Sequence, residues 1–426
     1  MYKNRDIKPL ENRAHLAIAT VHGDEMQYVQ QAFDENWVTT AGPNITAVEQ
    51  MLAEKLGVQN AVGLSAGTAA IHLAFKLAAE KVYGPAHAGT GCLAGKRVFA
   101  SDMTFAATVF PAIYEGANLT LIDSERDTWN MDPKALQKAF ELYPETKIVI
   151  VANLYGTPAK LDEIRTICDA HGAVLIEDAA ESFTATYKGR QTGTFGDLGI
   201  VSFNGNKLIT GSCGGALITN DVHTAHKARK WSTQSREDAP WYQHEEVGYN
   251  YRMSNITAGI IRAQLGHVDE HRAQKKAVYM RYKEAFKDLP VSMNPYTDDM
   301  EPNFWLSCLL INEEAMCKQV RGEQDVTFNP ESGKTCPTEI LEALASINAE
   351  GRPIWKPMSM QPLFRMNDFV TAEGYGRGLS NAYISEKKVD VVGKDVFQRG
   401  LCLPSANTMT KEQQDRVIEV VKRCFE

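Results

Sequence analysis

The stretch Leu198-Gly199-Ile200-Val201-Ser202-Phe203-Asn204-Gly205-Asn206-Lys207 places a lysine shortly after an apolar run, and Gly214-Gly215 follows it. Upstream, the run Ala173-Val174-Leu175-Ile176 leads into Glu177-Asp178. Short apolar runs bounded by turn residues are typical of strands buried inside a sheet. An acidic residue therefore ends one predicted strand, and a lysine follows the next one.

Together, Lys207 and Asp178 fit the needs of pyridoxal phosphate (PLP). In enzymes that use this cofactor, a lysine holds the aldehyde as a Schiff base and a carboxylate faces the pyridine nitrogen. Each residue alone has a simpler explanation. A lone lysine in a loop is usually a solvated surface charge, and Asp178 could cap a helix that begins at Ala179. The apolar runs around Lys207 favour an enclosed lysine.

Predicted strands and helices alternate along the first half of the chain, which indicates a mostly parallel sheet with helices on both faces. We expect strands at 61–64, 97–100, 119–122, 148–152 and 173–176, and helices at 47–56, 69–79, 106–114 and 161–171. Ligands of such sheets bind beyond the carboxyl ends of the strands. Because the notable polar residues all follow predicted strands, this fold predicts one shared site.

With 426 residues, the chain is longer than one compact core needs, and we expect two domains. The large domain should span 36–266. A long charged helix at 268–289 then opens a smaller C-terminal α+β domain, 267–426, which ends in a helix at 411–425. Residues 1–35 are expected to pack on the smaller domain.

Composition excludes several classes of protein. Apolar residues make up 44% of the chain and charged residues 23%, as in ordinary soluble proteins. The net charge of -8 argues against a nucleic-acid-binding protein. Eight scattered cysteines form no CxxC pair, which favours a reduced cytoplasmic setting, and no metal site is expected. No apolar run is long enough for a membrane span or leader.

Further residues could complete a PLP site. Gly67-Thr68 opens a predicted helix after a strand, where free N–H groups attract phosphate, although such turns are also common without a ligand. Ser202 could bind the same phosphate. Phe105 could stack on the pyridine ring, but a phenylalanine after a strand more often belongs to the core. Glu181 would lie one turn beyond Asp178, near the phenolic oxygen of the cofactor.

At this point the sequence resembles the DegT-type nucleotide-sugar aminotransferases, a family of fold-type I PLP enzymes. The resemblance spans about 36–404. The motifs that carry it are Ser65-Ala66-Gly67-Thr68-Ala69-Ala70, Asn153-Leu154-Tyr155-Gly156, Asp178-Ala179-Ala180-Glu181-Ser182, Thr194-Phe195-Gly196-Asp197, Ser202-Phe203 with Lys207, Gly248-Tyr249-Asn250-Tyr251-Arg252-Met253-Ser254 and Arg352-Pro353-Ile354-Trp355-Lys356-Pro357.

The resemblance implies a role for each matching residue. Lys207 would bind the cofactor covalently and move protons, and Asp178, Glu181, Gly67, Thr68, Ser202 and Phe105 would hold it as described. Asn250 would reach the cofactor phosphate of a neighbouring subunit, which implies a homodimer with shared sites. The substrate would meet Arg252, Arg352, Trp355 and Lys356, where the basic side chains suit a diphosphate or a carboxylate.

Within the family, the chain resembles most the branch that aminates UDP-linked 4-keto-6-deoxy-N-acetylhexosamines for bacterial glycans, with glutamate as the usual amino donor. That branch commonly has histidines near the substrate where this chain has Ser359 and Asn153. One alternative is a related PLP sugar dehydratase, but that branch carries histidine in place of Lys207. A non-catalytic protein that binds PLP or a nucleotide sugar, and a plain amino-acid aminotransferase, are further alternatives.

Overall fold

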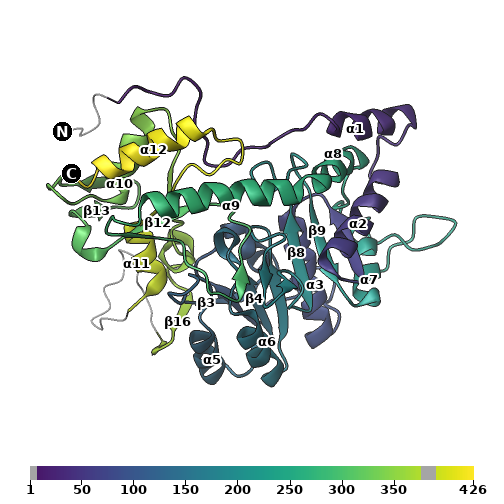
Figure 1. The fold of residues 1–426 in the computed structure, drawn as a ribbon. Coiled ribbons are helices and arrows are strands. Elements are labelled where there is room, and N and C mark those ends of the chain that lie inside the picture. Colours follow the sequence, from purple (N-terminus) through teal and green to yellow (C-terminus); the bar gives the residue numbers. More distant parts are fainter. Residues whose placement is uncertain (1–6, 376–389) are drawn as a thin grey trace.

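The computed structural model describes residues 7–375 and 390–426, and its centre is a nine-stranded sheet (Figure 1). The strand order is β1-β9-β8-β5-β4-β2-β3-β16-β17. Neighbours from β8 to β16 pair in parallel, whereas β9 and β17 pair antiparallel with their neighbours. The strands are β1 (Asn60–Leu64), β2 (Arg97–Ser101), β3 (Asn118–Ile122), β4 (Ile148–Ala152), β5 (Val174–Asp178), β8 (Leu198–Ser202), β9 (Gly215–Thr219), β16 (Asp368–Thr371) and β17 (Gly374–Tyr375). The predicted α/β fold with a mostly parallel sheet is confirmed.

Helices cover both faces of this sheet because its strands are apolar on both sides. Successive residues of a strand point to opposite faces. In β4, Ile148 and Ile150 therefore pack in one core with α3, whereas Val149 and Val151 pack in another core with α5 and α6. The helices of this part are α1 (Glu25–Asp34), α2 (Pro43–Leu56), α3 (Gly67–Tyr83), α4 (Phe110–Tyr114), α5 (Pro133–Leu142), α6 (Leu161–Ala170), α7 (Val222–Ser232) and α8 (Asn255–Gly266).

A second core surrounds a four-stranded antiparallel sheet of order β10-β12-β18-β15. Its strands are β10 (Val291–Met293), β12 (Cys308–Ile311), β15 (Arg352–Pro353) and β18 (Gly400–Cys402), and its helices are α9 (Val268–Ala285), α10 (Pro337–Ser346), α11 (Val392–Arg399) and α12 (Lys411–Arg423). Helix α9 runs along both parts of the molecule (Figure 1). Short two- and three-residue strands complete the fold at β6 (Thr186–Tyr187), β7 (Arg190–Gln191), β11 (Met300–Glu301), β13 (Gln319–Arg321) and β14 (Val326–Phe328).

Segments from both the N-terminal and the C-terminal regions contribute to both parts of the molecule. Ile7, Leu10 and Ala14 join the second core, whereas α1 packs against α8 of the large part. In return, β16 pairs in parallel with β3, so a segment that follows α9 by many residues extends the large sheet. The division at residue 266 stays a prediction about domains, since both parts exchange segments.

One predicted helix is interrupted. The expected helix at 106–114 is a 3-10 turn, Ala106–Thr108, followed by α4. Pro111 lies in the first turn of α4, where its missing N–H costs nothing because that donor would be unpaired anyway. The helix therefore begins at Phe110. Thr108 lies in the 3-10 turn before it, and its hydroxyl donates to Asp178.

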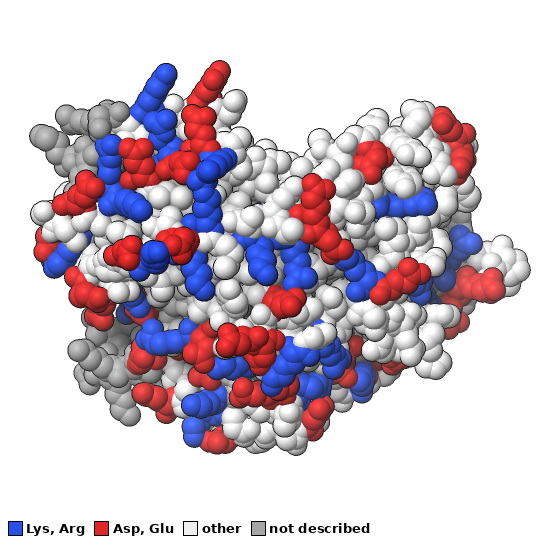
Figure 2. All heavy atoms as spheres, in the orientation of Figure 1, with Lys and Arg blue, Asp and Glu red and all other residues white. Residues whose placement is uncertain are grey.

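Charges are spread over the surface. On the face shown in Figure 2, basic and acidic side chains are interspersed. All eight cysteines are free thiols. Within 7–375 and 390–426, no helix is both long and apolar enough to cross a membrane.

Candidate active site

The predicted site forms at the carboxyl ends of β5 and β8. Asp178 is the last residue of β5 and lies opposite Ile200 of β8. Ser202 ends β8, and a turn in which the Lys207 N–H donates to the Asn204 carbonyl (2.9 Å) brings the lysine back to the same edge. The structure therefore brings Lys207, Asp178 and Ser202 together, as adjacent parallel strands should.

Lys207 is enclosed rather than solvated. Its side chain is only 12% exposed, and its Nζ atom lies 3.8 Å from Oε1 of Glu181. Trp305 packs against the lysine. Its ring centroid lies 4.4 Å from Nζ, and its indole N–H donates to the Asn206 carbonyl at 2.7 Å. A cation over the face of an indole is held by the ring quadrupole. Trp305 thus positions both the amine and the turn that carries it.

Two buried carboxyl groups flank the amine. Asp178 accepts a hydrogen bond from the Thr108 hydroxyl (2.7 Å) and another from the Ala180 N–H (3.0 Å). Burial raises the pKa of Asp178, while Thr108, the Ala180 N–H and the charge of Lys207 act against that rise. Burial likewise raises the pKa of Glu181 to about 7, opposed first by Lys207. Buried carboxyl groups of this kind need a cationic partner.

The start of α3 forms a cradle next to Ser202. Helix α3 begins at Gly67, and the N-cap residue Ala66 offers no side-chain cap to its first N–H groups. A Cβ atom on Gly67 would lie 3.0 Å from the Cβ of Ser202, and one on Gly215 would lie 2.5 Å from the Gly67 nitrogen. Glycine is therefore required for this close approach. Open N–H groups at the start of a long helix beside a serine hydroxyl suit a phosphate.

Aromatic side chains line the space beside the amine. Phe105 is 55% exposed, which excludes the alternative that it is a core residue. Its ring lies 5.4 Å from that of Trp355, which in turn lies 5.1 Å from the buried ring of Tyr155. The Trp355 N–H donates to the Tyr155 hydroxyl at 2.9 Å, and the Tyr155 N–H donates to Glu181 at 2.8 Å. Phe105 and Trp355 are thus two faces on which a planar ring or a sugar could pack.

The other predicted site residues are more dispersed. The guanidinium group of Arg252 is paired with Glu49 and with the Gly63 carbonyl, so it braces β1 against α2 within the chain. Lys356 lies 3.6 Å from Glu323, and Arg352 is exposed on β15. Asn250 is exposed and bridges to Thr233 at the base of a projecting segment. Their substrate and cofactor roles stay predictions.

The side chains of Asn153 and Ser359, which replace the histidines common in the related branch, are both hydrogen-bonded within the protein. Asn153 is 1% exposed, donates to Glu177 at 3.0 Å and accepts from the Ala159 N–H at 2.8 Å. The Ser359 N–H and hydroxyl both donate to Asp102, at 2.6 and 2.8 Å. Burial raises the pKa of Asp102 to about 7. Both side chains are therefore engaged by hydrogen bonds within the protein.

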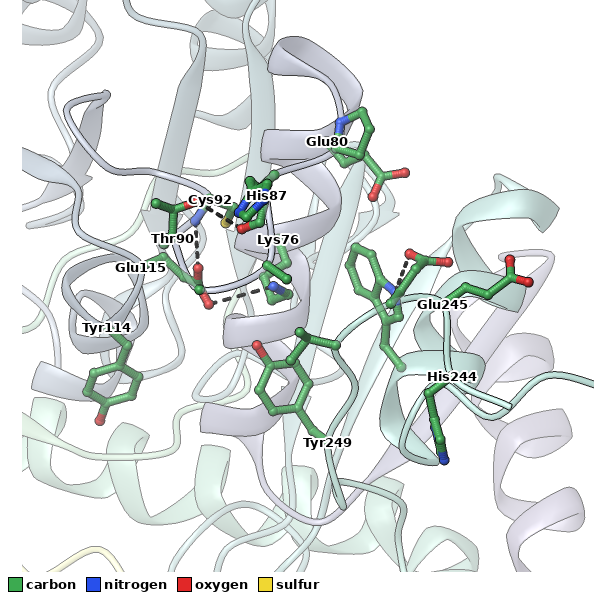
Figure 3. Close-up of a pocket in the computed structure, with 18 residues that line it drawn as sticks. Lys76, Glu80, His87, Thr90, Cys92, Tyr114, Glu115, His244, Glu245 and Tyr249 are labelled. Carbon is green, nitrogen blue, oxygen red and sulfur yellow. Dashed lines mark hydrogen bonds and ion pairs between the residues drawn. The ribbon is translucent and has the colours of Figure 1, made fainter. Parts of the chain in front are cut away.

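A large cavity lies elsewhere in the molecule. It measures about 600 Å³ and is lined by Lys76 of α3 together with the segments 85–92 and 244–249 (Figure 3). Cys92 and Glu115, which also line it, precede β2 and β3, so it opens toward the amino ends of those strands. Lys76 lies 3.8 Å from Glu115. Since ligands of such sheets bind at the carboxyl ends, size alone does not identify the active site.

Lys275 is a second buried lysine that could be mistaken for the reactive one. Burial lowers its pKa to about 7, which is a common property of reactive lysines. However, its ammonium group donates to the carbonyl oxygens of Trp305 (3.0 Å) and Ser405 (2.7 Å). Among the residues that the structure describes, it forms no ion pair comparable to that between Lys207 and Glu181. Lys275 therefore ties α9 to the segments around it.

Three contributors were not predicted from the sequence as site residues: Thr108, Tyr155 and Trp305. Tyr155 lies in the motif Asn153-Leu154-Tyr155-Gly156 after a predicted strand, and Thr108 lies three residues after Phe105; these positions were the only signals for them. Tyr155 adopts a positive φ of 54° before Gly156, which turns its ring under Trp355. Trp305 comes from the second half of the chain, and no local sequence pattern predicts its contact with Lys207.

The residues present fit PLP. Lys207 offers an enclosed primary amine, Asp178 a buried carboxylate for the pyridine nitrogen, and α3 with Ser202 a phosphate cradle. Phe105 offers an exposed ring face for stacking. These residues therefore offer a partner for the aldehyde, the pyridine nitrogen, the phosphate and the ring face of the cofactor.

Comparison with known proteins identifies the relatives of the chain. Residues 20–422 match the DegT/DnrJ/EryC1/StrS aminotransferase family. A putative pyridoxal phosphate-dependent aminotransferase of Bacillus subtilis (strain 168), EpsN, is 41% identical over 421 residues, which cover 98% of this chain and 97% of that protein. GDP-perosamine synthase of Caulobacter vibrioides is 30% identical over 97% of this chain and 98% of its own length.

Solved structures share the fold. The PLP form of the putative sugar aminotransferase Spr1654 from Streptococcus pneumoniae superposes with a TM-score of 0.79 at 19% identity, over 97% of this chain and 99% of that one.

Proposed function

The chain belongs to the DegT/DnrJ/EryC1/StrS family and is a PLP-dependent sugar aminotransferase, and we propose that it transfers the amino group of glutamate to a UDP-linked 4-keto-6-deoxy-N-acetylhexosamine. The observation that carries the proposal is the enclosure of Lys207 beside Glu181 and Asp178 at the carboxyl end of the sheet. The presence of Lys207 also disfavours the dehydratase alternative, which the sequence resemblance associates with histidine at this position.

When bound, PLP supplies an electron sink for the carbon that loses its proton. The side chains of this protein would then do the following. Asp178, whose charged form the Thr108 hydroxyl favours, would hold the proton on the pyridine nitrogen. The Lys207 amine would take the proton from the reacting carbon and return it to a neighbouring one, because its Nζ atom lies in the same enclosed space. Ser202 and the start of α3 would hold the phosphate.

The sugar would bind against the aromatic face of Trp355, which lies next to Phe105. Lys356 follows Trp355 directly, and its partner Glu323 is 42% exposed, so a diphosphate could compete for the lysine. UDP is proposed as the nucleotide because the sequence most resembles the family branch that acts on UDP-linked sugars. A GDP-linked sugar is the second candidate, because one relative is named GDP-perosamine synthase and is 30% identical.

The proposed assembly is a homodimer with shared sites. Asn250 is exposed, and the segment between it and Thr233 carries the exposed side chains of Trp241, Tyr242 and Val247. The same segment projects from the body of the molecule in Figure 1. Exposed aromatic groups on a projecting segment favour contact with another protein surface. A second copy would cover them and bring Asn250 to the neighbouring phosphate.

Incubation of the holoenzyme with glutamate and either the UDP-linked or a GDP-linked 4-keto-6-deoxy sugar, followed by mass and NMR analysis, tests the proposal. We expect an amino sugar from the UDP-linked substrate and none from a Lys207→Ala variant. An amino sugar from the GDP-linked substrate alone would contradict the nucleotide assignment. If neither is aminated but two amino-acid/keto-acid pairs are interconverted, the protein is an amino-acid aminotransferase.

A further inference from the structure

Three histidines from separate segments meet where α8 joins α9. His22 precedes α1, His267 lies between α8 and α9, and His271 lies in the first turns of α9. The Nε2 atoms of His22 and His271 are 2.7 Å apart, although the residues are 249 positions apart in the chain. The ring of His22 also stacks on that of His267, with centroids 3.6 Å apart. Glu270 completes the group, with Oε2 at 3.7 Å from Nδ1 of His267.

The partners of these rings decide which nitrogen carries the proton. The Nδ1 atom of His271 lies 2.9 Å from the Leu208 carbonyl oxygen, which can only accept, so Nδ1 is the donor. The Nε2 atom of His267 lies 3.1 Å from the Asp24 carboxylate, which fixes Nε2 as the donor in the same way. In the neutral rings, therefore, Nε2 of His271 and Nδ1 of His267 carry no proton and each offers a lone pair.

These lone pairs face groups that are also rich in electrons. Nε2 of His271 faces a nitrogen of His22, and Nδ1 of His267 faces the carboxylate of Glu270. A proton on His22 can satisfy His271, whereas His267 can pair with Glu270 as well as Asp24 only when both of its ring nitrogens carry a proton or when a cation lies between them. A ligating histidine typically donates its other N–H to a carbonyl or carboxylate, which is the arrangement of both His271 and His267.

We propose that His22, His267, His271 and Glu270 bind a divalent transition-metal ion, with zinc as the expected ion. Ligand atoms of His22, His267 and Glu270 lie within 4.8 Å of one another, and His271 adds a fourth beside His22. Three imidazoles and one carboxylate match tetrahedral zinc, whereas calcium and magnesium prefer oxygen ligands. Around tetrahedral zinc such ligand atoms lie roughly 3.4 Å apart, which follows from bonds of about 2.0–2.1 Å. Nε2 of His22 would therefore move away from Nε2 of His271, from 2.7 Å, and Glu270 would move slightly closer to His267, from 3.7 Å.

The required movements fall on the outer side chains. Glu270 is exposed and His22 is half-buried, so rotation about their side-chain bonds can unstack His22 from His267 and bring the carboxylate inward. The backbone is already held in place. Glu25 accepts hydrogen bonds from the N–H groups of His22 (3.0 Å) and Gly23 (2.7 Å) and from the Gln264 amide of α8 (2.6 Å).

The metal would connect the N-terminal segment to the loop of the reactive lysine. Leu208, whose carbonyl accepts from His271, directly follows Lys207. A bound ion would therefore fix α1, the junction of α8 and α9, and the lysine loop relative to one another. The site is separate from the transamination chemistry, so its test does not depend on the substrate.

Zinc binding to the tag-free holoenzyme tests the proposal. The enzyme is stripped with a chelator, incubated with zinc, passed through a desalting column and analysed for bound metal. Cobalt then serves as a spectroscopic probe, because tetrahedral coordination gives strong visible bands. We expect about one zinc ion per chain and tetrahedral cobalt bands in the wild type.

His22→Ala and His267→Ala should lose the ion. Glu270→Gln removes the charge of the one carboxylate ligand but keeps the size of this exposed side chain, and should weaken binding roughly tenfold. His226→Ala, an exposed histidine of α7, is the matched control and should bind like the wild type. Equal zinc retention by the wild type and His22→Ala, or absence of zinc from a wild type that keeps its PLP, would overturn the proposal. So would unchanged binding by Glu270→Gln, a variant that should fold normally.

Discussion

The Oγ1 atom of Thr108 lies 2.7 Å from the Oδ2 atom of Asp178, so a hydroxyl from the turn after β2 donates into the carboxylate that ends β5. Thr108 in turn lies 2.6 Å from the hydroxyl of Thr104. The contact opposes the rise that burial causes in the pKa of Asp178. It therefore helps to keep the carboxylate charged beside the pyridine nitrogen it is proposed to hold.

Asp178→Asn should lower kcat by roughly 100-fold, because a neutral amide cannot hold the positive charge on the pyridine nitrogen. Thr108→Val should cause a smaller loss, because the carboxylate remains but loses the donor that favours its charged form. Thr108→Ser keeps the hydroxyl and is the matched control. Steady-state kinetics with bound PLP verified by absorbance would measure this. Equal activity of the Val and Ser variants would contradict the role given to Thr108.

Phe105→Ala should weaken PLP binding by about tenfold, because an exposed aromatic face is lost from the cofactor ring. Phe33→Ala on α1 is the matched control, since Phe33 is 58% exposed and Phe105 is 55% exposed. Fluorescence titration of the apoenzyme with PLP measures the dissociation constants. If the two variants bind PLP equally well, Phe105 does not stack on the cofactor.

Co-expression of Lys207→Ala and Asn250→Ala chains tests whether sites are shared between subunits. If Asn250 acts across the interface, one site of the heterodimer carries both changes and the other carries neither. The purified heterodimer should then show about half of the wild-type activity, whereas each homodimer should be nearly inactive. Activity no higher than that of the Asn250→Ala homodimer would show that Asn250 serves its own subunit.

Stability should fall as pH rises through the range below 7, in part because of Asp102. Burial raises its pKa from 3.8 to about 7, so within this range the folded protein holds a proton that the unfolded chain has released. The free energy of unfolding therefore decreases with rising pH in this window.

Asp102→Asn should reduce this dependence, because the amide has no proton to release. Between pH 5 and pH 8, urea unfolding should show a loss of stability smaller than that of the wild type by on the order of 2 kcal/mol. Asp34→Asn, an exposed residue of α1, should leave the dependence unchanged. Parallel curves for the wild type and Asp102→Asn would exclude a raised pKa at this position.

Sequence reasoning could predict the sheet and the centre of the site because both depend on local pattern. Lys207, Asp178 and Ser202 all follow apolar strands, and parallel strands place their carboxyl ends at one edge. It could not predict that β16 joins the large sheet, because strand order depends on packing between distant segments.

The remaining contacts depend on side-chain packing, which sequence spacing does not encode. Trp305 reaches Lys207 from the segment between β11 and β12, and Tyr155 reaches Trp355 through a backbone turn of positive φ. The hydrogen bonds from Asn153 to Glu177 and from Ser359 to Asp102 also join segments far apart in the sequence. His22 and His271 meet only after folding, since the chain between them contains most of the large sheet.

Peptide mapping after borohydride reduction of the holoenzyme would identify the lysine that binds the cofactor, which we propose is Lys207. Reduction fixes PLP to the amine that holds it. We expect a phosphopyridoxyl group on the peptide that contains Lys207. A label on Lys275, the buried lysine whose pKa is lowered to about 7, on Lys76, or on no lysine would contradict it.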